Sequence, residues 1–154
     1  MAVYYHDTSA LVKHYHTEIG TAVVDDLLVE PFSHHFLSRL AGVELESALA
    51  KHVRMNLITA AVFHSSRRKF RTDVTNGQFK ILRLLVRHLQ KAENLIRQHG
   101  LTQSLRTLDA IQLAVALDLH QRYGLDYFVC ADTNLCAIAI AEGLAVINPV
   151  THTP

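Results

Sequence analysis

The sequence has few of the residues that mark disordered, fibrous or disulfide-stapled proteins. Its 154 residues include 6 Gly, 3 Pro and 2 Cys, and 49% of them are hydrophobic. This composition excludes a low-complexity chain and a collagen-like repeat, and two cysteines cannot staple a small secreted domain. No apolar run approaches the roughly 18 residues of a membrane span. We therefore expect one globular domain over residues 1–154, with a single hydrophobic core.

Other absences bear on location and cofactors. The first basic residue is Lys13, and Asp7 precedes it, which is unlike the start of a secretory signal. The simplest interpretation of Cys130 and Cys136 is a pair of reduced thiols, so we expect a cytoplasmic protein that has no membrane partner. Neither the P-loop motif nor the glycine motif of dinucleotide-binding proteins occurs. The sequence therefore indicates no nucleotide cofactor.

Positive charge is concentrated in one part of the chain. The formal net charge is only +1, yet residues 51–97 contain 11 of the 15 Lys and Arg and only two acidic residues. A chain divided in this way suits a polyanion or an acidic protein as partner. A solvated helical face is the open alternative, because Lys and Arg are usually exposed in any protein.

Segments typical of strands and helices alternate along the chain. We expect strands at 2–6, 32–38, 78–83, 126–132 and 144–149. We expect helices at about 10–16, 23–30, 39–54, 60–71, 85–99, 108–123 and 133–142, with TDVTNG (72–77) as a turn. This alternation predicts an α/β fold whose mainly parallel sheet is covered by helices on both faces. Ligands of such sheets bind beyond the carboxyl ends of the strands.

Four carboxylates stand out because of their surroundings. Asp7 and Asp132 each lie at the carboxyl end of a predicted strand, Asp109 lies in the first turn of an otherwise apolar helix, and Glu44 lies within LAGVELESALA. A buried ionised carboxylate is costly without a positive partner, and only Arg106 is close to one of them in sequence. Several acids brought together repel one another, and a hard cation such as Mg²⁺ or Mn²⁺ resolves the repulsion. A carboxylate-bound ion with open water positions can hydrolyse a phosphodiester bond.

Each of these acids also has a purely structural interpretation. The two that follow strands could only cap the next helix, Asp109 could be favoured by the helix dipole, and Glu44 could be a surface residue. Helix geometry sets two neighbouring acids apart from the group. Glu46 lies about 200° around the helix from Glu44, and Asp118 projects from the side opposite Asp109, where we expect it to be solvated.

Four segments of the chain resemble the motifs of PIN-domain ribonucleases, especially toxins of the VapC type. They are HDTSALVKHYHTEIG, VELESALAKHVR, LRTLDAIQLAVAL and FVCADTNLCAIAIAEGLAVINP, in the order of that family and over nearly the whole chain. The resemblance implies a three-layer α/β/α fold, a metal site made of Asp7, Glu44, Asp109 and Asp132, and Mg²⁺- or Mn²⁺-dependent endonucleolytic cleavage of RNA that leaves a 5′-phosphate. Gln112 departs from the pattern, since many members have His there, but no expected ligand is missing.

The resemblance also implies partners, and the residues near the four acids and in the basic segment suggest supporting roles. It implies a homodimer, and a small antitoxin protein that inserts a segment into the active-site groove. Thr8, Thr133 and Asn134 are expected to orient waters or ligands around the metal. The candidates for contact with the RNA backbone are Arg67, Arg68, Lys69 and Arg106. The first three could instead face the antitoxin or solvent, and the last could pair with a nearby acid.

Three functions remain open on the sequence alone. The first is the toxin ribonuclease of a type II toxin–antitoxin system, and the second is a housekeeping PIN nuclease that processes RNA with the same residues. The third is a catalytically silent binding module that keeps the fold, against which the four intact acids argue. A small antitoxin reading frame directly upstream would distinguish the toxin from the processing enzyme.

Overall fold

Strands and helices alternate along the chain in the computed structural model, which describes residues 1–152. The strands are β1 (Val3–His6), β2 (His34–Ser38), β3 (Lys80–Leu82), β4 (Tyr127–Val129) and β5 (Val146–Ile147). The helices are α1 (Thr8–Tyr15), α2 (Thr21–Leu28), α3 (Ala41–Arg54), α4 (Ala60–Thr75), α5 (Val86–His99), α6 (Thr107–Tyr123) and α7 (Thr133–Ala141). All five strands lie within the ranges that the sequence predicts, including the short β3.

The five strands form one sheet in the order β3-β2-β1-β4-β5, and every neighbouring pair is parallel. The register places Tyr5 beside Phe36 of β2 and Phe128 of β4. Because the strands are parallel, the residues that follow them all emerge at one edge of the sheet. The predicted parallel sheet is therefore confirmed.

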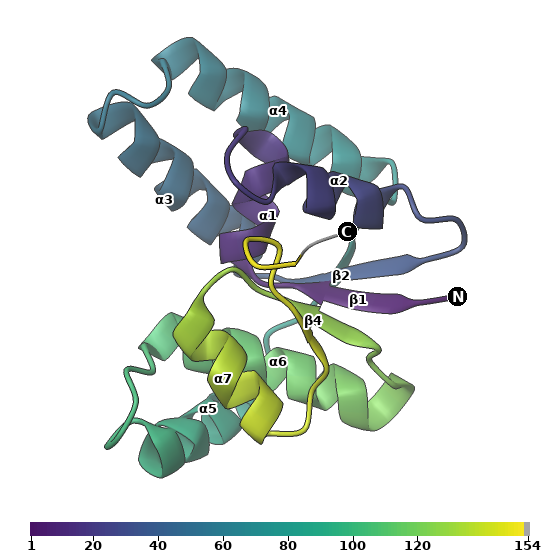
Figure 1. The fold of residues 1–154 in the computed structure, drawn as a ribbon, viewed down its shortest axis with the longest axis vertical. Helices are drawn as coiled ribbons and strands as arrows, with labels where there is room; N and C mark the ends of the chain where they lie inside the picture. Colours follow the sequence, from purple (N-terminus) through teal and green to yellow (C-terminus); the bar gives the residue numbers. More distant parts are fainter. Residues whose placement is uncertain (153–154) are drawn as a thin grey trace.

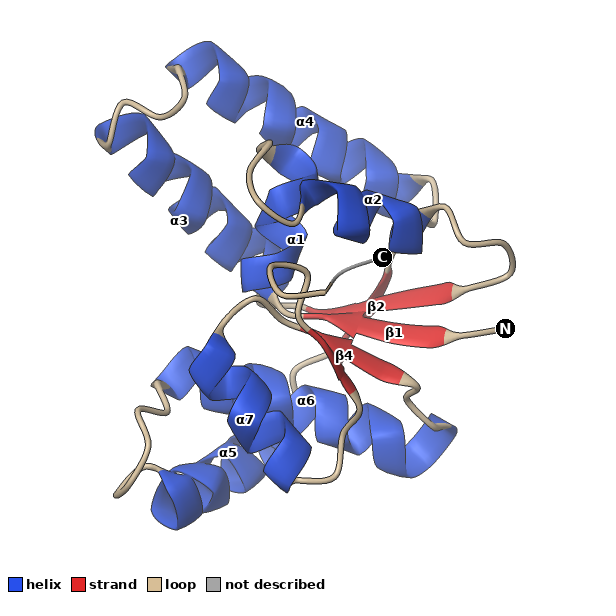
Figure 2. Ribbon diagram, in the orientation of Figure 1, coloured by secondary structure: helices blue, strands red, loops and turns tan. Residues whose placement is uncertain are grey.

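Helices cover both faces of this sheet, which makes three layers (Figures 1 and 2). On one face, α1 to α4 bury an apolar cluster that includes Leu11, Leu37 and Leu45. On the other face, α5, α6 and α7 pack over a larger cluster that includes Leu113 and Phe128. The predicted three-layer α/β/α fold is confirmed, and the apolar side chains that drive it come from alternate faces of the strands.

The largest departure from the predicted elements is in α4. The predicted turn TDVTNG begins inside this helix, which continues to Thr75 before Gly77 takes a positive φ of 81°. Two tertiary contacts explain the extension, because Tyr15 Oη donates a 2.7 Å hydrogen bond to Asp73 and Val74 packs against the apolar cluster under α1 and α3. Packing outweighs the weak local preference of these residues for a turn.

None of the helices in residues 1–152 combines the length and the hydropathy that crossing a membrane requires.

Candidate active site

Asp7 and Asp132 lie beside one another at the carboxyl edge of the sheet, because β1 and β4 are neighbours. Asp7 precedes α1, and its Oδ2 accepts hydrogen bonds from the backbone N–H and the hydroxyl of Ser9, at 2.9 and 2.5 Å. Asp132 precedes α7, and its Oδ1 accepts a bond from the Leu135 N–H at 2.9 Å. Ser9 Oγ also accepts a bond from the Ala131 N–H at 3.0 Å, which ties the two loops together.

Glu44 reaches this edge from the first turn of α3. Its Oε2 accepts a hydrogen bond from Thr8 Oγ1 at 3.1 Å and another from the side-chain amide of Gln112. Gln112 is fully buried, and its carbonyl oxygen accepts a bond from the hydroxyl of Tyr5, which is also fully buried. The Gln112 amide contacts Thr8 Oγ1 at 3.3 Å as well. Glu44 is thus held by a hydrogen-bonded chain that starts in the core of the sheet.

Asp109 comes from the first turn of α6, one helical turn before Gln112. Residues three apart lie on the same side of a helix, so Asp109 and Gln112 face the same region. Asp109 is half-buried, and Arg106 at the start of the helix opposes the rise in its pKa. The four predicted acids therefore come from two strand ends and two helices that are far apart in sequence.

The pKa values show that these carboxylates share one electrostatic environment. Burial raises the pKa of Asp7, and the charge of Asp132 raises it further. Burial likewise raises the pKa of Glu44 to about 7, with contributions from Asp7 and Asp109. The pKa of Asp109 is raised to about 6 by burial and then by Asp7 and Asp132. Like charges in a partly desolvated site disfavour one another, and perturbation of this kind is typical of functional sites.

Three of the acids use only one carboxylate oxygen to support the fold. Among the described residues, their hydrogen bonds end on Oδ2 of Asp7, Oε2 of Glu44 and Oδ1 of Asp132. The second oxygen of each group, Oδ1, Oε1 and Oδ2 respectively, is left for a ligand. Orientation of a ligating carboxylate through its other oxygen is common around metal ions in proteins.

The fit of a metal ion follows from the chemistry of these donors. Within residues 1–152, no three His, Cys, Asp or Glu side chains are arranged so that they could hold an ion directly. The donors at the edge of the sheet are all carboxylate oxygens, which Mg²⁺ and Mn²⁺ prefer to softer ligands. Mg²⁺ also keeps several of its waters, so it requires few direct protein ligands. The donor set therefore suits a hydrated hard cation.

The residues expected to support the metal ligands differ in their placement. Thr8 is buried and donates to Glu44, as a supporting residue should. The Asn134 amide instead donates to the backbone carbonyl of Ser104, which fastens α7 to the loop before α6. Thr133 is exposed. Of the three, only Thr8 has a described contact with a predicted ligand.

The two acids that helix geometry sets apart do lie away from this site. Glu46 pairs with Arg67, with 2.6 Å between Oε1 and Nε. Asp118 was expected to be solvated, and that expectation is wrong. It bonds to Arg87 and Arg122 at 2.9 Å and lies 3.1 Å from the His88 ring, because α5 packs along α6 at this point.

The predicted RNA contacts are distributed over several surfaces. Arg67 is engaged with an acid on α3, and Lys69 lies 3.0 Å from the His14 ring and over the ring of Tyr15. Arg68 and Arg106 are exposed. Of the four, Arg106 is the one whose charge acts on an acid of the site, since it opposes the rise in the pKa of Asp109. The assignment of all four to RNA stays a prediction.

Sequence reasoning did not identify Gln112 and Tyr5 as parts of the site. One signal was available, because Gln112 is a polar residue in an apolar helix, one turn after Asp109. A buried amide nearly always has hydrogen-bond partners, so its position predicts a polar network. The identity of the partners was not predictable, because Glu44 is 68 residues away in sequence and Tyr5 is 107 residues away.

Known structures with the same fold were found over nearly the full length of the chain. VapC20 of Mycobacterium tuberculosis, described as a toxin that cleaves the sarcin–ricin loop, is 12% identical with a TM-score of 0.68, over 95% of this chain and 99% of that one. The protein PAE2754 of Pyrobaculum aerophilum is 21% identical with a TM-score of 0.64, over 94% and 83% of the two chains. A toxin–antitoxin complex from Klebsiella pneumoniae contains a chain that is 18% identical with a TM-score of 0.62, over 97% and 98%.

At these identities the structural likeness establishes the fold alone. No curated protein sequence matches the chain at a significant level. The family is established by sequence instead, because the model of the PIN domain matches residues 4–147. This match includes the four acids at the carboxyl edge of the sheet and all five strands except Val3, the first residue of β1. The chain therefore belongs to the PIN domain family.

Proposed function

We propose that the chain is a metal-dependent endoribonuclease that hydrolyses RNA phosphodiester bonds and leaves 5′-phosphate ends. The observation that carries this proposal is the set of four carboxylates at one edge of the sheet, where burial and neighbouring acids raise the pKa values of Asp7, Glu44 and Asp109. Repulsion of this kind lowers the stability of the fold unless a cation binds. A nuclease metal site explains why the fold contains such an arrangement.

In this proposal Asp7, Glu44, Asp109 and Asp132 hold Mg²⁺ or Mn²⁺, directly or through bound water. The bound ion supplies a water of lowered pKa and neutralises charge on the scissile phosphate. The protein supplies fixed orientation, because hydrogen bonds within the fold hold one oxygen of three of these groups. Preorganised ligands reduce the rearrangement that binding requires.

Glu44 has a second proposed role, in proton transfer. In the metal-free protein, burial raises the pKa of this carboxyl group to about 7, well above that of an ordinary glutamate, so its affinity for a proton is higher than usual. Its Oε2 is held by Thr8 and Gln112, so Oε1 is the atom that would take a proton from an attacking water. Binding of a cation nearby favours the ionised form that this role requires.

We further propose that the chain is the toxin of a type II toxin–antitoxin system, silenced by a cognate antitoxin protein. Support comes from the toxin and the toxin–antitoxin complex among the structures with this fold. A homodimer in the cytoplasm is part of the same proposal. Induced expression should arrest bacterial growth, and co-expression of a small protein encoded directly upstream should restore it.

A cleavage assay on total RNA tests the enzymatic proposal. We expect wild-type protein to cleave RNA with Mg²⁺ or Mn²⁺ and not with EDTA, and the products should be sensitive to an exonuclease that requires a 5′-phosphate. Asp7→Asn should reduce cleavage to background while the protein still folds. Asp118→Asn is the matched control, because it removes a carboxylate whose partners lie on α5 and α6, and it should cleave normally. An Asp7→Asn protein with wild-type activity would falsify the proposed site.

A further inference from the structure

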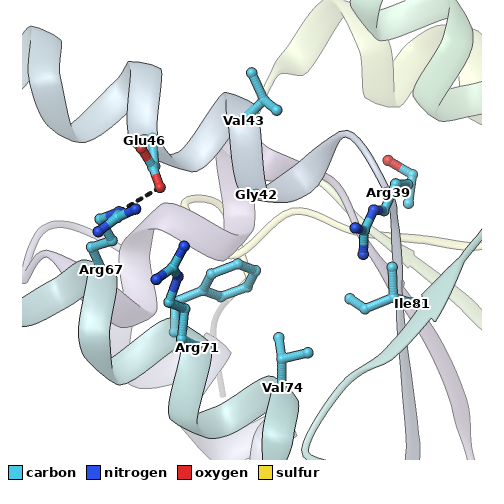
Figure 3. A pocket seen from close by; sticks show the side chains of 10 residues that line it. Arg39, Gly42, Val43, Glu46, Arg67, Arg71, Val74 and Ile81 are labelled. Atoms are coloured by element: carbon cyan, nitrogen blue, oxygen red, sulfur yellow. Dashed lines mark hydrogen bonds and ion pairs between the residues drawn. The ribbon is translucent and has the colours of Figure 1, made fainter.

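A groove lies between α3 and α4 and extends to Arg39, the residue that follows β2 (Figure 3). Its volume is about 370 Å³, within the range of sites for small organic groups. The α3 wall contains Gly42 and Val43, and Val43 directly precedes Glu44. Gly42 and Glu46 of the same wall lie about 200° around the helix from Glu44, so the groove meets the acidic site at the carboxyl end of β2, where Arg39 lines it, and not along α3. Because β2 pairs with β1, this end of the groove lies at the same edge of the sheet as Asp7.

The α4 wall combines cationic, aromatic and aliphatic side chains. Arg67, Phe70, Arg71 and Val74 follow helical spacing and line the groove together. Arg67 is neutralised by Glu46 across the groove, as Figure 3 shows. Arg71 is exposed and has no ion-pair partner among residues 1–152. The groove therefore keeps an uncompensated positive charge beside a half-buried aromatic ring.

A second unpaired arginine lies where the groove meets the sheet. Arg39 follows β2, so it emerges at the same edge as Asp7, and it is exposed and without an ion-pair partner in the described part of the chain. Its backbone N–H donates a 2.9 Å hydrogen bond to the Leu82 carbonyl, which brings it beside Arg83 at the end of β3. Arg39 and Arg83 both line a neighbouring cavity. Positive charge therefore continues from the groove along the carboxyl edge of the sheet.

We propose that this groove binds a nucleotide of the RNA substrate next to the scissile bond, an inference that rests on the proposed function. Arg39 and Arg71 bind backbone phosphates, and the base packs against Phe70 and Val43. A groove that combines cations with an aromatic surface is typical of sites for single-stranded nucleic acid. Continuity with the edge that carries the acids favours RNA over an acidic protein as the occupant. The contact is made to the backbone and to a base face, so it adds affinity without selecting a sequence.

Binding of the protein to a labelled single-stranded RNA 12-mer is measured by fluorescence anisotropy. All variants for this assay also carry Asp7→Asn, so that the RNA is not cleaved. Arg39→Ala/Arg71→Ala should raise the Kd roughly tenfold, and the slope of log Kd against log salt should fall by about 1.4, or about 0.7 for each single-stranded phosphate contact. Both arginines are exposed, so the variant should fold, and thermal melting checks this. Arg39→Lys/Arg71→Lys keeps the charge and should restore most of the salt dependence. Arg97→Ala, on α5 under the opposite face of the sheet, is the control and should change neither quantity.

A cross-link locates the base. RNA that carries 4-thiouridine should cross-link to the segment of α4 that contains Phe70, and mass spectrometry of the digested protein should identify it. Cross-links confined to other segments, or an unchanged salt slope in the double alanine variant, would overturn the proposal. A polyglutamate peptide that binds as tightly as the RNA and depends equally on Arg39 and Arg71 would assign the groove to an acidic protein instead.

Kinetics separate failure of this inference from failure of the proposed function. In the active protein, Arg39→Ala/Arg71→Ala should raise KM while kcat stays close to wild type, because the lost contacts stabilise substrate and transition state alike. Cleavage by wild type with an unchanged KM in the variant would reject the groove and leave the nuclease intact. RNA binding that depends on both arginines, in a protein that cleaves no RNA with either metal, would reject the nuclease and leave the groove.

Discussion

Gln112 donates its side-chain amide to the same carboxylate oxygen of Glu44 that Thr8 holds, and the hydroxyl of Tyr5 fixes the other end of the amide. The orientation of a predicted metal ligand on α3 is therefore set by two fully buried residues of α6 and β1. Loss of a hydrogen-bonding partner of this kind typically lowers metal affinity by about 10- to 100-fold.

The first prediction concerns this pair. Gln112→Leu keeps the approximate volume but removes the amide, so Glu44 loses its main support and Mn²⁺ affinity should fall about tenfold. Isothermal titration calorimetry measures the affinity, and thermal melting confirms the fold. Tyr5→Phe leaves the amide in place and should have a smaller effect. Wild-type Mn²⁺ affinity in a folded Gln112→Leu protein would show that Glu44 needs no such support.

The second prediction links metal binding to pH. Asp109 and Glu44 have pKa values of about 6 and 7, raised above those of the unfolded chain. In the metal-free protein their ionisation therefore removes stability as pH rises from about 4 through 7. Mg²⁺ binds the ionised groups and offsets this loss, so the increase in Tm that it produces should be small at pH 5.5 and large at pH 8. Asp7→Asn should lose most of the increase, and equal increases at both pH values would contradict the explanation.

The third prediction concerns Asp118. Arg87 holds the pKa of this carboxyl group well below its usual range, with help from His88 and Arg122. A depressed folded pKa gives stability that is present above about pH 4 and is lost as pH falls through the folded value. At pH 7, Asp118→Asn should lower the free energy of unfolding by about 1–2 kcal/mol, and urea unfolding at pH 7 and pH 3 should show the difference closing at the lower pH. Its Mg²⁺ response should match that of wild type.

The fourth prediction concerns two buried imidazoles, 2.9 Å apart. Burial lowers the pKa of His6 to about 3 and of His35 to about 4, below the ordinary 6.5. The unfolded chain therefore binds more protons between pH 6.5 and about 4, and the fold loses stability as pH falls through that window. His35→Asn removes one of the two groups, so its unfolding free energy should decline less steeply from pH 7 to 5. Parallel curves for the variant and wild type would show that His35 takes up its proton in the fold.

Local patterns were sufficient to predict the architecture of this chain. Short apolar segments typical of strands alternate with longer segments typical of helices, and turn residues separate them. That alternation alone predicts a parallel sheet between helices. The end of α4 was missed because Asp73 and Val74 are held by contacts with distant residues. A window of neighbouring residues contains no information about such contacts.

The candidate site was predictable only in part. Asp7 and Asp132 follow neighbouring strands, so their proximity is a consequence of topology. The rest of the site depends on which side chains meet in space. This holds for the hydrogen bonds that support Glu44, and for the lack of ion-pair partners of Arg39 and Arg71 within residues 1–152. Arg67 illustrates the difference, because it belongs to the most basic segment of the sequence and yet is neutralised by Glu46.

Asp7 and Asp132 each begin a helix as well as contributing to the acidic site. Alanine scanning of these positions would confound two losses, since a missing cap alone weakens a helix by about 1 kcal/mol. Asparagine caps a helix as well as aspartate does, so it isolates the effect of charge. These two roles link the chemistry of the protein to its folding. A substitution at either position that removes the cap would destabilise α1 or α7, and it would also weaken the binding of any ion held between the two carboxylates.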